Sequence, residues 1–186
     1  MAIKVRLSEE RGFFDYEWLK TYYTFSFGEY EDSNYNSFHS LRVLNECWIR
    51  PGVGFPLHTN HDIEILSVVI EGAIAYQDSS GHGSILQPGA IQLSSTGTGI
   101  TYTELNGSDR EEAHFFQIWL LPNKLKLKPY YQEKFIPISE RHNKWCLIFS
   151  EDGRENSLSV NQNALIYHTI LERENEKISS VCSSFI

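Results

Sequence analysis

The chain has 186 residues, of which 41% are hydrophobic and 22% are charged, and its formal net charge is −8. This length allows one large domain or two small ones with a buried core. A negative surface disfavours binding to nucleic acid, because such binding needs basic groups that displace counterions. No apolar run approaches the length of about 20 residues that a membrane-spanning helix needs. We therefore expect neither a nucleic acid nor a membrane as a partner.

The three cysteines are widely spaced, at Cys47, Cys146 and Cys182. An odd number without CxxC spacing argues against a disulfide framework and against a zinc site. The N-terminal residues contain no apolar segment of the kind found in secretory signals. Together these features predict a cytoplasmic protein.

The first two-thirds of the chain reads as short elements separated by turns. Trp18, Leu19 and Tyr22 fall at helical spacing, which predicts a short helix over residues 15–23. An aromatic and acidic loop is expected over 25–36. Two strand pairs are expected around Gly72 and around the Pro88-Gly89 turn. The predicted strands of this part are 41–44, 48–50, 65–71, 73–76, 84–86, 90–93 and 115–121.

The last third predicts a second, smaller unit. Alternating Lys and Leu residues over 123–128 suggest a solvated edge strand, in which lysine blocks edge-to-edge pairing. Residues 129–137 read as a linker, and the strands that follow are expected at 145–149, 157–160 and 165–171. We therefore divide the chain into residues 1–128 and 129–186. Many short strands with evenly spaced turns predict an all-β sandwich or barrel.

Polar side chains with ligand character lead directly into one of these strands. On a regular strand, side chains alternate faces, so His58, Asn60, Asp62 and Glu64 would share a face and His61 would point away. Downstream, Tyr102 and Glu104 are also two residues apart. Two such segments are what a metal site inside a small β-barrel needs. No phosphate loop, nucleophile elbow or dinucleotide fingerprint competes with this site.

These two segments resemble the cupin motifs, and longer stretches resemble the pirin family. The first motif spans Gly52 to Glu64 and the second spans Gly99 to Asn106. The more specific stretches are ERGFFDYEWLKTYYTFSFGEYED, HTNHDIEILSVVIEGAIAYQDSSG, SSTGTGITYTELN and FQIWLLP. The similarity runs from about Arg11 to Phe135. It implies an all-β fold with cupin-type β-barrels (a double-stranded β-helix, or jelly roll) in two tandem units. The second unit is expected to be incomplete.

Pirins hold one iron-type metal with two histidines from the first motif and a histidine and a glutamate from the second. Position by position, the resemblance places these ligands at His58, Asn60, Tyr102 and Glu104, with Glu104 also in a catalytic role. Two of the expected histidines are therefore Asn and Tyr. One alternative is a degenerate site that still binds one Fe or another divalent transition metal, with His61 or Glu64 replacing a lost ligand. The other is a metal-free, hydrogen-bonded polar cluster.

The resemblance implies two classes of function. The first is a quercetin 2,3-dioxygenase-like enzyme that acts on a flavonoid-like small molecule. The second is a non-catalytic regulatory module that binds a protein partner or a small molecule without metal. An open second barrel would expose strand edges and apolar side chains. We therefore expect domain docking, a protein partner or self-association to cover Trp145, Leu147 and Phe149.

Overall fold

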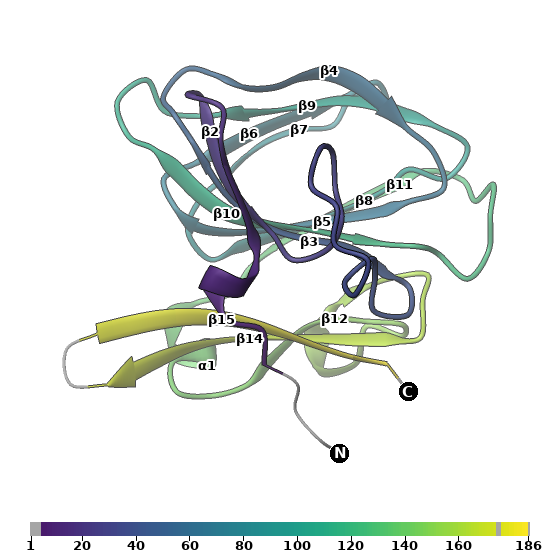
Figure 1. Cartoon of the computed structure of the whole chain (residues 1–186). Helices are drawn as coiled ribbons and strands as arrows, with labels where there is room; N and C mark the ends of the chain where they lie inside the picture. Colours follow the sequence, from purple (N-terminus) through teal and green to yellow (C-terminus); the bar gives the residue numbers. More distant parts are fainter. Residues whose placement is uncertain (1–4, 174–175, 186) are drawn as a thin grey trace.

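The computed structural model describes residues 5–173 and 176–185, and it confirms the all-β, cupin-type fold. Three sheets are stacked in layers, and the middle sheet takes strands from both sides of residue 128 (Figure 1). This middle sheet has the strand order β1-β2-β3-β10-β5-β8-β11. Its strands are β1 (Gly12–Asp15), β2 (Leu19–Tyr23), β3 (Leu41–Ile49), β5 (Glu64–Glu71), β8 (Ala90–Ser95), β10 (Ala113–Leu120) and β11 (Tyr130–Phe135).

A four-stranded sheet lies on each face of the middle sheet. The upper one has the order β4-β9-β6-β7 and closes the N-terminal barrel, and the lower one has the order β13-β12-β14-β15 (Figure 1). The upper strands are β4 (Gly54–Asn60), β6 (Ile74–Asp78), β7 (Gly83–Leu86) and β9 (Ile100–Asn106). The lower strands are β12 (Cys146–Ser150), β13 (Leu158–Ser159), β14 (Ala164–Arg173) and β15 (Glu176–Phe185). The short helices are η1 (Ser8–Glu10), α1 (Ile138–Arg141) and η2 (Arg154–Asn156).

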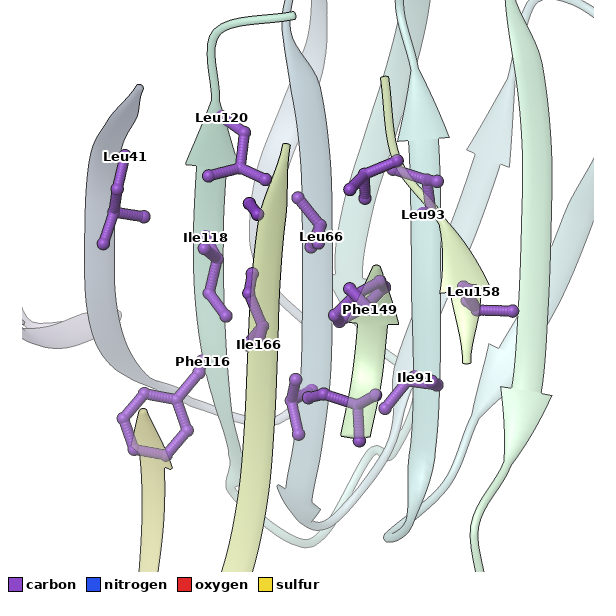
Figure 2. Close-up of a cluster of buried hydrophobic side chains, with 14 of the residues drawn as sticks. Leu41, Leu66, Ile91, Leu93, Phe116, Ile118, Leu120, Phe149, Leu158 and Ile166 are labelled. Carbon is purple, nitrogen blue, oxygen red and sulfur yellow. The ribbon is translucent and has the colours of Figure 1, made fainter. Parts of the chain in front are cut away.

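Both faces of the middle sheet are buried, which explains the continuous apolar runs in its central strands. On β5, Leu66 and Val68 pack with the lower sheet, whereas Ile65 and Val69 face the barrel interior. Figure 2 shows the lower interface, where apolar side chains of the middle sheet meet Phe149, Leu158 and Ile166. Each such side chain contributes roughly 1.5–3 kcal/mol when it is fully buried. This interface therefore fixes the second unit against the barrel.

The predicted helix over residues 15–23 is wrong. Leu19, Thr21 and Tyr23 alternate as buried side chains on β2, which pairs with β1 on one side and β3 on the other. Because the segment has a strand partner on both sides, its period of two prevails over the helical spacing of Trp18, Leu19 and Tyr22. The aromatic loop expected over 25–36 lies outside regular secondary structure.

The two expected strand pairs are also wrong, although their strands exist. β5 lies in the middle sheet and β6 in the upper one, so the chain changes layers at Gly72. Gly72 has a φ of +69°, and a Cβ there would lie 2.4 Å from the carbonyl oxygen of Glu112. Glycine is thus required by both conformation and space. β7 and β8 are divided between the same two sheets in the same way.

The connection between the units differs from the expected one. The lysine-rich stretch 123–128 is not a strand, and the expected linker contains β11, which pairs with β8 at the edge of the middle sheet. The division at residue 128 itself stays a prediction. Leu147 and Phe149 are both buried, and Phe149 lies in the core between the lower and middle sheets, whereas Trp145 is 57% exposed. Among the described residues, no helix is long and apolar enough to span a membrane.

A buried carboxylate links the two units. Glu64 Oε1 accepts hydrogen bonds from Ser95 Oγ (2.6 Å) and Asn161 Nδ2 (3.1 Å). Its Oε2 accepts from the backbone N–H of Asn161 (3.2 Å) and from Tyr130 Oη (3.4 Å). Glu64 therefore faces the lower sheet, and its role is to hold Asn161 of the second unit.

Replacing Glu64 with alanine is expected to lower the free energy of unfolding by about 3 kcal/mol, because its buried donors lose a charged acceptor. Urea denaturation measures this change. The matched control is Glu71→Ala, at the exposed end of the same strand, which should change stability by less than about 0.5 kcal/mol. Equal unfolding midpoints for the two variants would contradict the structural role of Glu64.

A buried histidine in the lower sheet makes stability depend on pH. His168 lies on β14 opposite Cys146, and Arg141 Nη1 is 3.4 Å from its Nδ1. Burial, followed by the charge of Arg141, lowers the pKa of His168 to about 4. The unfolded chain takes up this proton near pH 6.5, whereas the folded chain resists doing so until about pH 4.

The stability contributed by the neutral His168 ring is therefore fully present above pH 6.5 and is lost as the pH falls from 6.5 to 4. The pKa shift corresponds to about 3 kcal/mol over that window. Thermal unfolding at a series of pH values should show this slope in the native chain and a flatter one in His168→Gln. The control His142→Gln, on a half-exposed histidine beside Glu172, should retain most of the slope. A slope unchanged in His168→Gln would refute the assignment.

Candidate functional site

The inner side of β9 carries the two predicted site residues of the second motif. Side chains on β9 alternate regularly, so Tyr102 and Glu104 both point into the barrel and are fully buried. Leu105 faces outward and is partly exposed. The sequence pattern predicted this shared face correctly, because β9 is a regular strand with a partner on each side.

Strand β4 brings the residues of the first motif onto Tyr102. The β4–β9 register places His58 directly opposite Tyr102, after an irregularity between Phe55 and His58. The His58 ring lies 4.3 Å from the Tyr102 ring, centroid to centroid. Asn60 Nδ2 donates a 2.9 Å hydrogen bond to the Tyr102 hydroxyl. The two positions at which the resemblance leads us to expect histidine therefore bond to each other.

Glu104 is held by two side chains that sequence reasoning did not identify. Ser67 Oγ donates to Oε1 at 2.9 Å, and Gln117 Nε2 donates to Oε2 at 2.8 Å. Ser67 and Gln117 are paired neighbours on β5 and β10. A polar residue within an otherwise apolar strand was the only signal in the sequence. Burial raises the pKa of Glu104, and these two hydrogen bonds oppose that rise.

The Tyr102 hydroxyl stays protonated at neutral pH. Burial is the main cause of its raised pKa, and the neighbouring Glu104 carboxylate adds to the effect. The hydrogen bond from Asn60 opposes the rise only in part. Tyrosine binds transition metals well only as a phenolate, so a neutral Tyr102 is a poor ligand.

The residues after Asn60 leave the barrel face, contrary to the strand-like alternation. Asp62 has a φ of +51°, and its Oδ1 accepts a 2.6 Å hydrogen bond from the backbone N–H of Lys126. His61 is exposed, with its Nδ1 3.0 Å from the carbonyl oxygen of Thr98. Glu64 faces the opposite side of the middle sheet. The positive φ at Asp62 resets the alternation, so neither His61 nor Glu64 replaces a lost ligand here.

Comparison with known protein families matches residues 4–120 to Pirin. The chain belongs to the pirin family. This pirin is 36% identical over 182 residues to the quercetin 2,3-dioxygenase of Escherichia coli K12. The matched region covers 97% of this chain and 77% of that protein. It is 33% identical over 171 residues to the pirin-like protein YhaK of Escherichia coli O157:H7, covering 92% and 72%.

Solved structures give the same result. The crystal structure of YhhW from Escherichia coli matches this pirin with a TM-score of 0.85 and 37% identity, over 90% of this chain and 70% of that one. The nickel(II) complex of the bacterial pirin YhhW matches with a TM-score of 0.83 and 37% identity, over 90% and 71%. These comparisons confirm the family and the cupin fold that the sequence motifs predicted.

The donors of this pirin do not fit a centre made of three histidines and one glutamate. His58 can still offer an imidazole nitrogen, because its Nδ1 is engaged by the carbonyl oxygen of Pro56 at 2.7 Å and no hydrogen bond of its Nε2 is seen within the described ranges. Glu104 supplies a carboxylate, but Asn60 and Tyr102 supply only a neutral amide and a neutral phenol. Within the described ranges, no three His, Cys, Asp or Glu side chains converge as metal ligands.

Gln117→Leu is expected to destabilise the chain by about 2 kcal/mol, because it leaves one oxygen of the buried Glu104 without a donor. The matched control is Gln92→Leu, also buried in the middle sheet, whose Oε1 has no partner among the described residues. Removing an unsatisfied acceptor should cost less. Urea denaturation compares the two variants. An equal or smaller loss in Gln117→Leu would show that this hydrogen bond does not hold Glu104.

Proposed function

We propose that this pirin acts as a metal-independent binding module rather than as a dioxygenase. The observation that supports this proposal is the 2.9 Å hydrogen bond between Asn60 and Tyr102. It joins the two positions where an iron-type centre would need imidazoles. The fully buried Tyr102 ring also fills barrel space next to His58. His58, Asn60, Tyr102 and Glu104 then form a polar cluster that stabilises the barrel.

The partner we propose is a protein or a second copy of this chain. Three large apolar side chains around α1 support this choice: Phe135 (63% exposed), Ile138 (57%) and Trp145 (57%). Exposed aromatic and aliphatic groups of this kind favour protein contacts. The cytoplasmic location stays a prediction from the cysteine pattern and the sequence.

The second candidate is a metal-dependent, quercetin 2,3-dioxygenase-like enzyme acting on a flavonoid-like molecule. The His58 imidazole, whose Nε2 has no hydrogen bond among the described residues, and the Glu104 carboxylate that it influences favour this candidate. So do the relatives, one of which bears that enzyme name and another of which is a nickel(II) complex. In this candidate, His58 and Glu104 would hold a divalent metal, which would supply activation of the flavonol and of oxygen. Asn60 and Tyr102 would complete its surroundings as weak ligands.

Restoring both histidines distinguishes the two candidates. We would compare the native chain with Asn60→His/Tyr102→His, using untagged protein loaded with Fe(II) or Ni(II) and desalted. Metal content by mass spectrometry and quercetin-dependent oxygen uptake are the two measurements. The native chain is expected to retain little metal and to show no turnover, whereas the double variant gains stoichiometric metal. His58→Ala in the double-variant background is the control and should remove that metal.

Stoichiometric metal in the native chain that disappears in His58→Ala would overturn the metal-independent proposal. Quercetin turnover by such a loaded native chain would establish the second candidate. If the double variant folds but binds no metal, then the two substitutions are not what prevents binding, and the proposal loses its main support. Circular dichroism verifies the fold of each variant.

A further inference from the structure

A continuous stack of aromatic rings leads from the barrel centre to the molecular surface. Tyr102, Tyr76 and Tyr131, which we call the tyrosine ladder, have ring centroids 5.8 Å and 5.2 Å apart. Both contacts are near-parallel stacks, with interplanar angles of 28° and 24°. A histidine ring lies at each end of the ladder: the half-exposed His58 is 4.3 Å from Tyr102 and tilted by 54°, and the exposed His82 stacks 5.1 Å from Tyr131.

The strands explain why these distant residues meet. Tyr102 and Tyr76 lie on the neighbouring upper strands β9 and β6, and both point into the barrel. Tyr131 comes from β11 at the edge of the middle sheet, where it pairs with Ser94 of β8. Ser94 Oγ lies 3.0 Å from the Tyr76 hydroxyl and donates to it, because the single Tyr76 proton goes to Asp78. The ladder therefore links the upper and middle sheets, and packing holds its rings in place.

Two of the three hydroxyls donate to carboxylates. The Tyr131 hydroxyl donates to Glu133 Oε2 at 2.6 Å, and the Tyr76 hydroxyl donates to Asp78 Oδ2 at 3.1 Å. Asp78 is itself buried and accepts backbone N–H bonds from Ser80 (2.8 Å) and His82 (3.2 Å). A phenol loses an electron readily only when its proton has an acceptor at hand. Tyr131 and Tyr76 each have one.

We propose that Tyr131 and Tyr76 of the tyrosine ladder form a redox relay, which carries oxidising equivalents between the surface and the buried Tyr76. The co-reactant is a one-electron oxidant of the phenoxyl- or peroxyl-radical class. In the first step, the oxidant gains one electron from Tyr131, whose O–H bond breaks, and the proton passes to the Glu133 carboxylate. The products are the reduced oxidant, a Tyr131 phenoxyl radical and a neutral Glu133.

In the second step, the radical moves inward. Tyr76 gives one electron to the Tyr131 radical and its proton to Asp78, while Glu133 returns its proton to Tyr131. The products are a Tyr76 radical, a neutral Asp78, and Tyr131 and Glu133 in their starting forms. Tyr102 differs, because its hydroxyl accepts a hydrogen bond from Asn60 and no carboxylate bond to it is seen among the described residues. The radical is thus held at Tyr131 and Tyr76. The relay does not require a metal, so it is independent of the proposed function.

Photochemical oxidation tests the relay on the full chain. Laser flashes generate tris(bipyridine)ruthenium(III) from the ruthenium(II) complex and a sacrificial acceptor. Transient absorption and freeze-quench electron paramagnetic resonance then follow the tyrosyl radical. The variants are Tyr131→Phe, Tyr76→Phe and Glu133→Gln. The controls are Tyr16→Phe, an exposed tyrosine outside the ladder, and Glu140→Gln, an exposed glutamate on α1.

Tyr131→Phe is expected to lose most of the rapidly formed radical, whereas Tyr76→Phe keeps this rapid phase and loses the slower one. Glu133→Gln should slow radical formation by about 100-fold, which is typical when a positioned proton acceptor is removed. Both controls should behave like the native chain. The relay is overturned if Tyr131→Phe matches Tyr16→Phe in yield and rate, or if Glu133→Gln matches Glu140→Gln. The stack would then serve packing alone. Because each phenylalanine variant keeps its ring, the fold is expected to persist.

Discussion

Burial of the middle sheet on both faces is the constraint on which the rest of the structure depends. A strand covered on both sides has no solvent to satisfy its polar side chains, so each one needs a partner within the protein. On β5, Glu64 turns to the lower face and Ser67 to the upper face. On the lower face, the Glu64 carboxylate binds Asn161. On the upper face, Ser67 binds Glu104.

The two buried carboxylates differ in how completely they are satisfied. Glu64 accepts from three hydroxyl or amide side chains and from one backbone N–H, which suits a permanent structural anchor. Among the described residues, Glu104 accepts only from Ser67 and Gln117, and burial raises its pKa. A buried carboxyl group whose oxygens can still accept hydrogen bonds can change its protonation when a ligand or a charge lies beside it. The number of hydrogen bonds to each carboxylate therefore distinguishes Glu64, which is structural, from Glu104, which belongs to the candidate site.

The sequence predicted side-chain orientation correctly within a single regular strand. It did not predict strand pairing where the chain passes from one sheet to another. The alternation of Tyr102 and Glu104 was readable because β9 is regular over its whole length. The alternation beyond Asn60 was not, because Asp62 adopts a positive φ that composition does not reveal. Gly72 was recognised as a turn, but a turn residue does not indicate whether the next strand pairs or crosses to another sheet. Ser67 lies 37 residues from Glu104 in the sequence, and the fold alone brings it to the site beside Gln117.

The changes at positions 60 and 102 make physical sense only together. A phenol placed in the barrel without Asn60 would lack this donor to its oxygen, and Asn60 without Tyr102 would lose the acceptor of its N–H. The same substitution has a second consequence, because the large ring of Tyr102 reaches the Tyr76 ring. A residue that weakens the metal-ligand set therefore also completes an aromatic path from His58 to the surface. Where two further imidazole ligands are expected, the barrel holds a neutral amide and a neutral phenol that stacks on the Tyr76 ring, and that exchange determines which chemistry its interior supports.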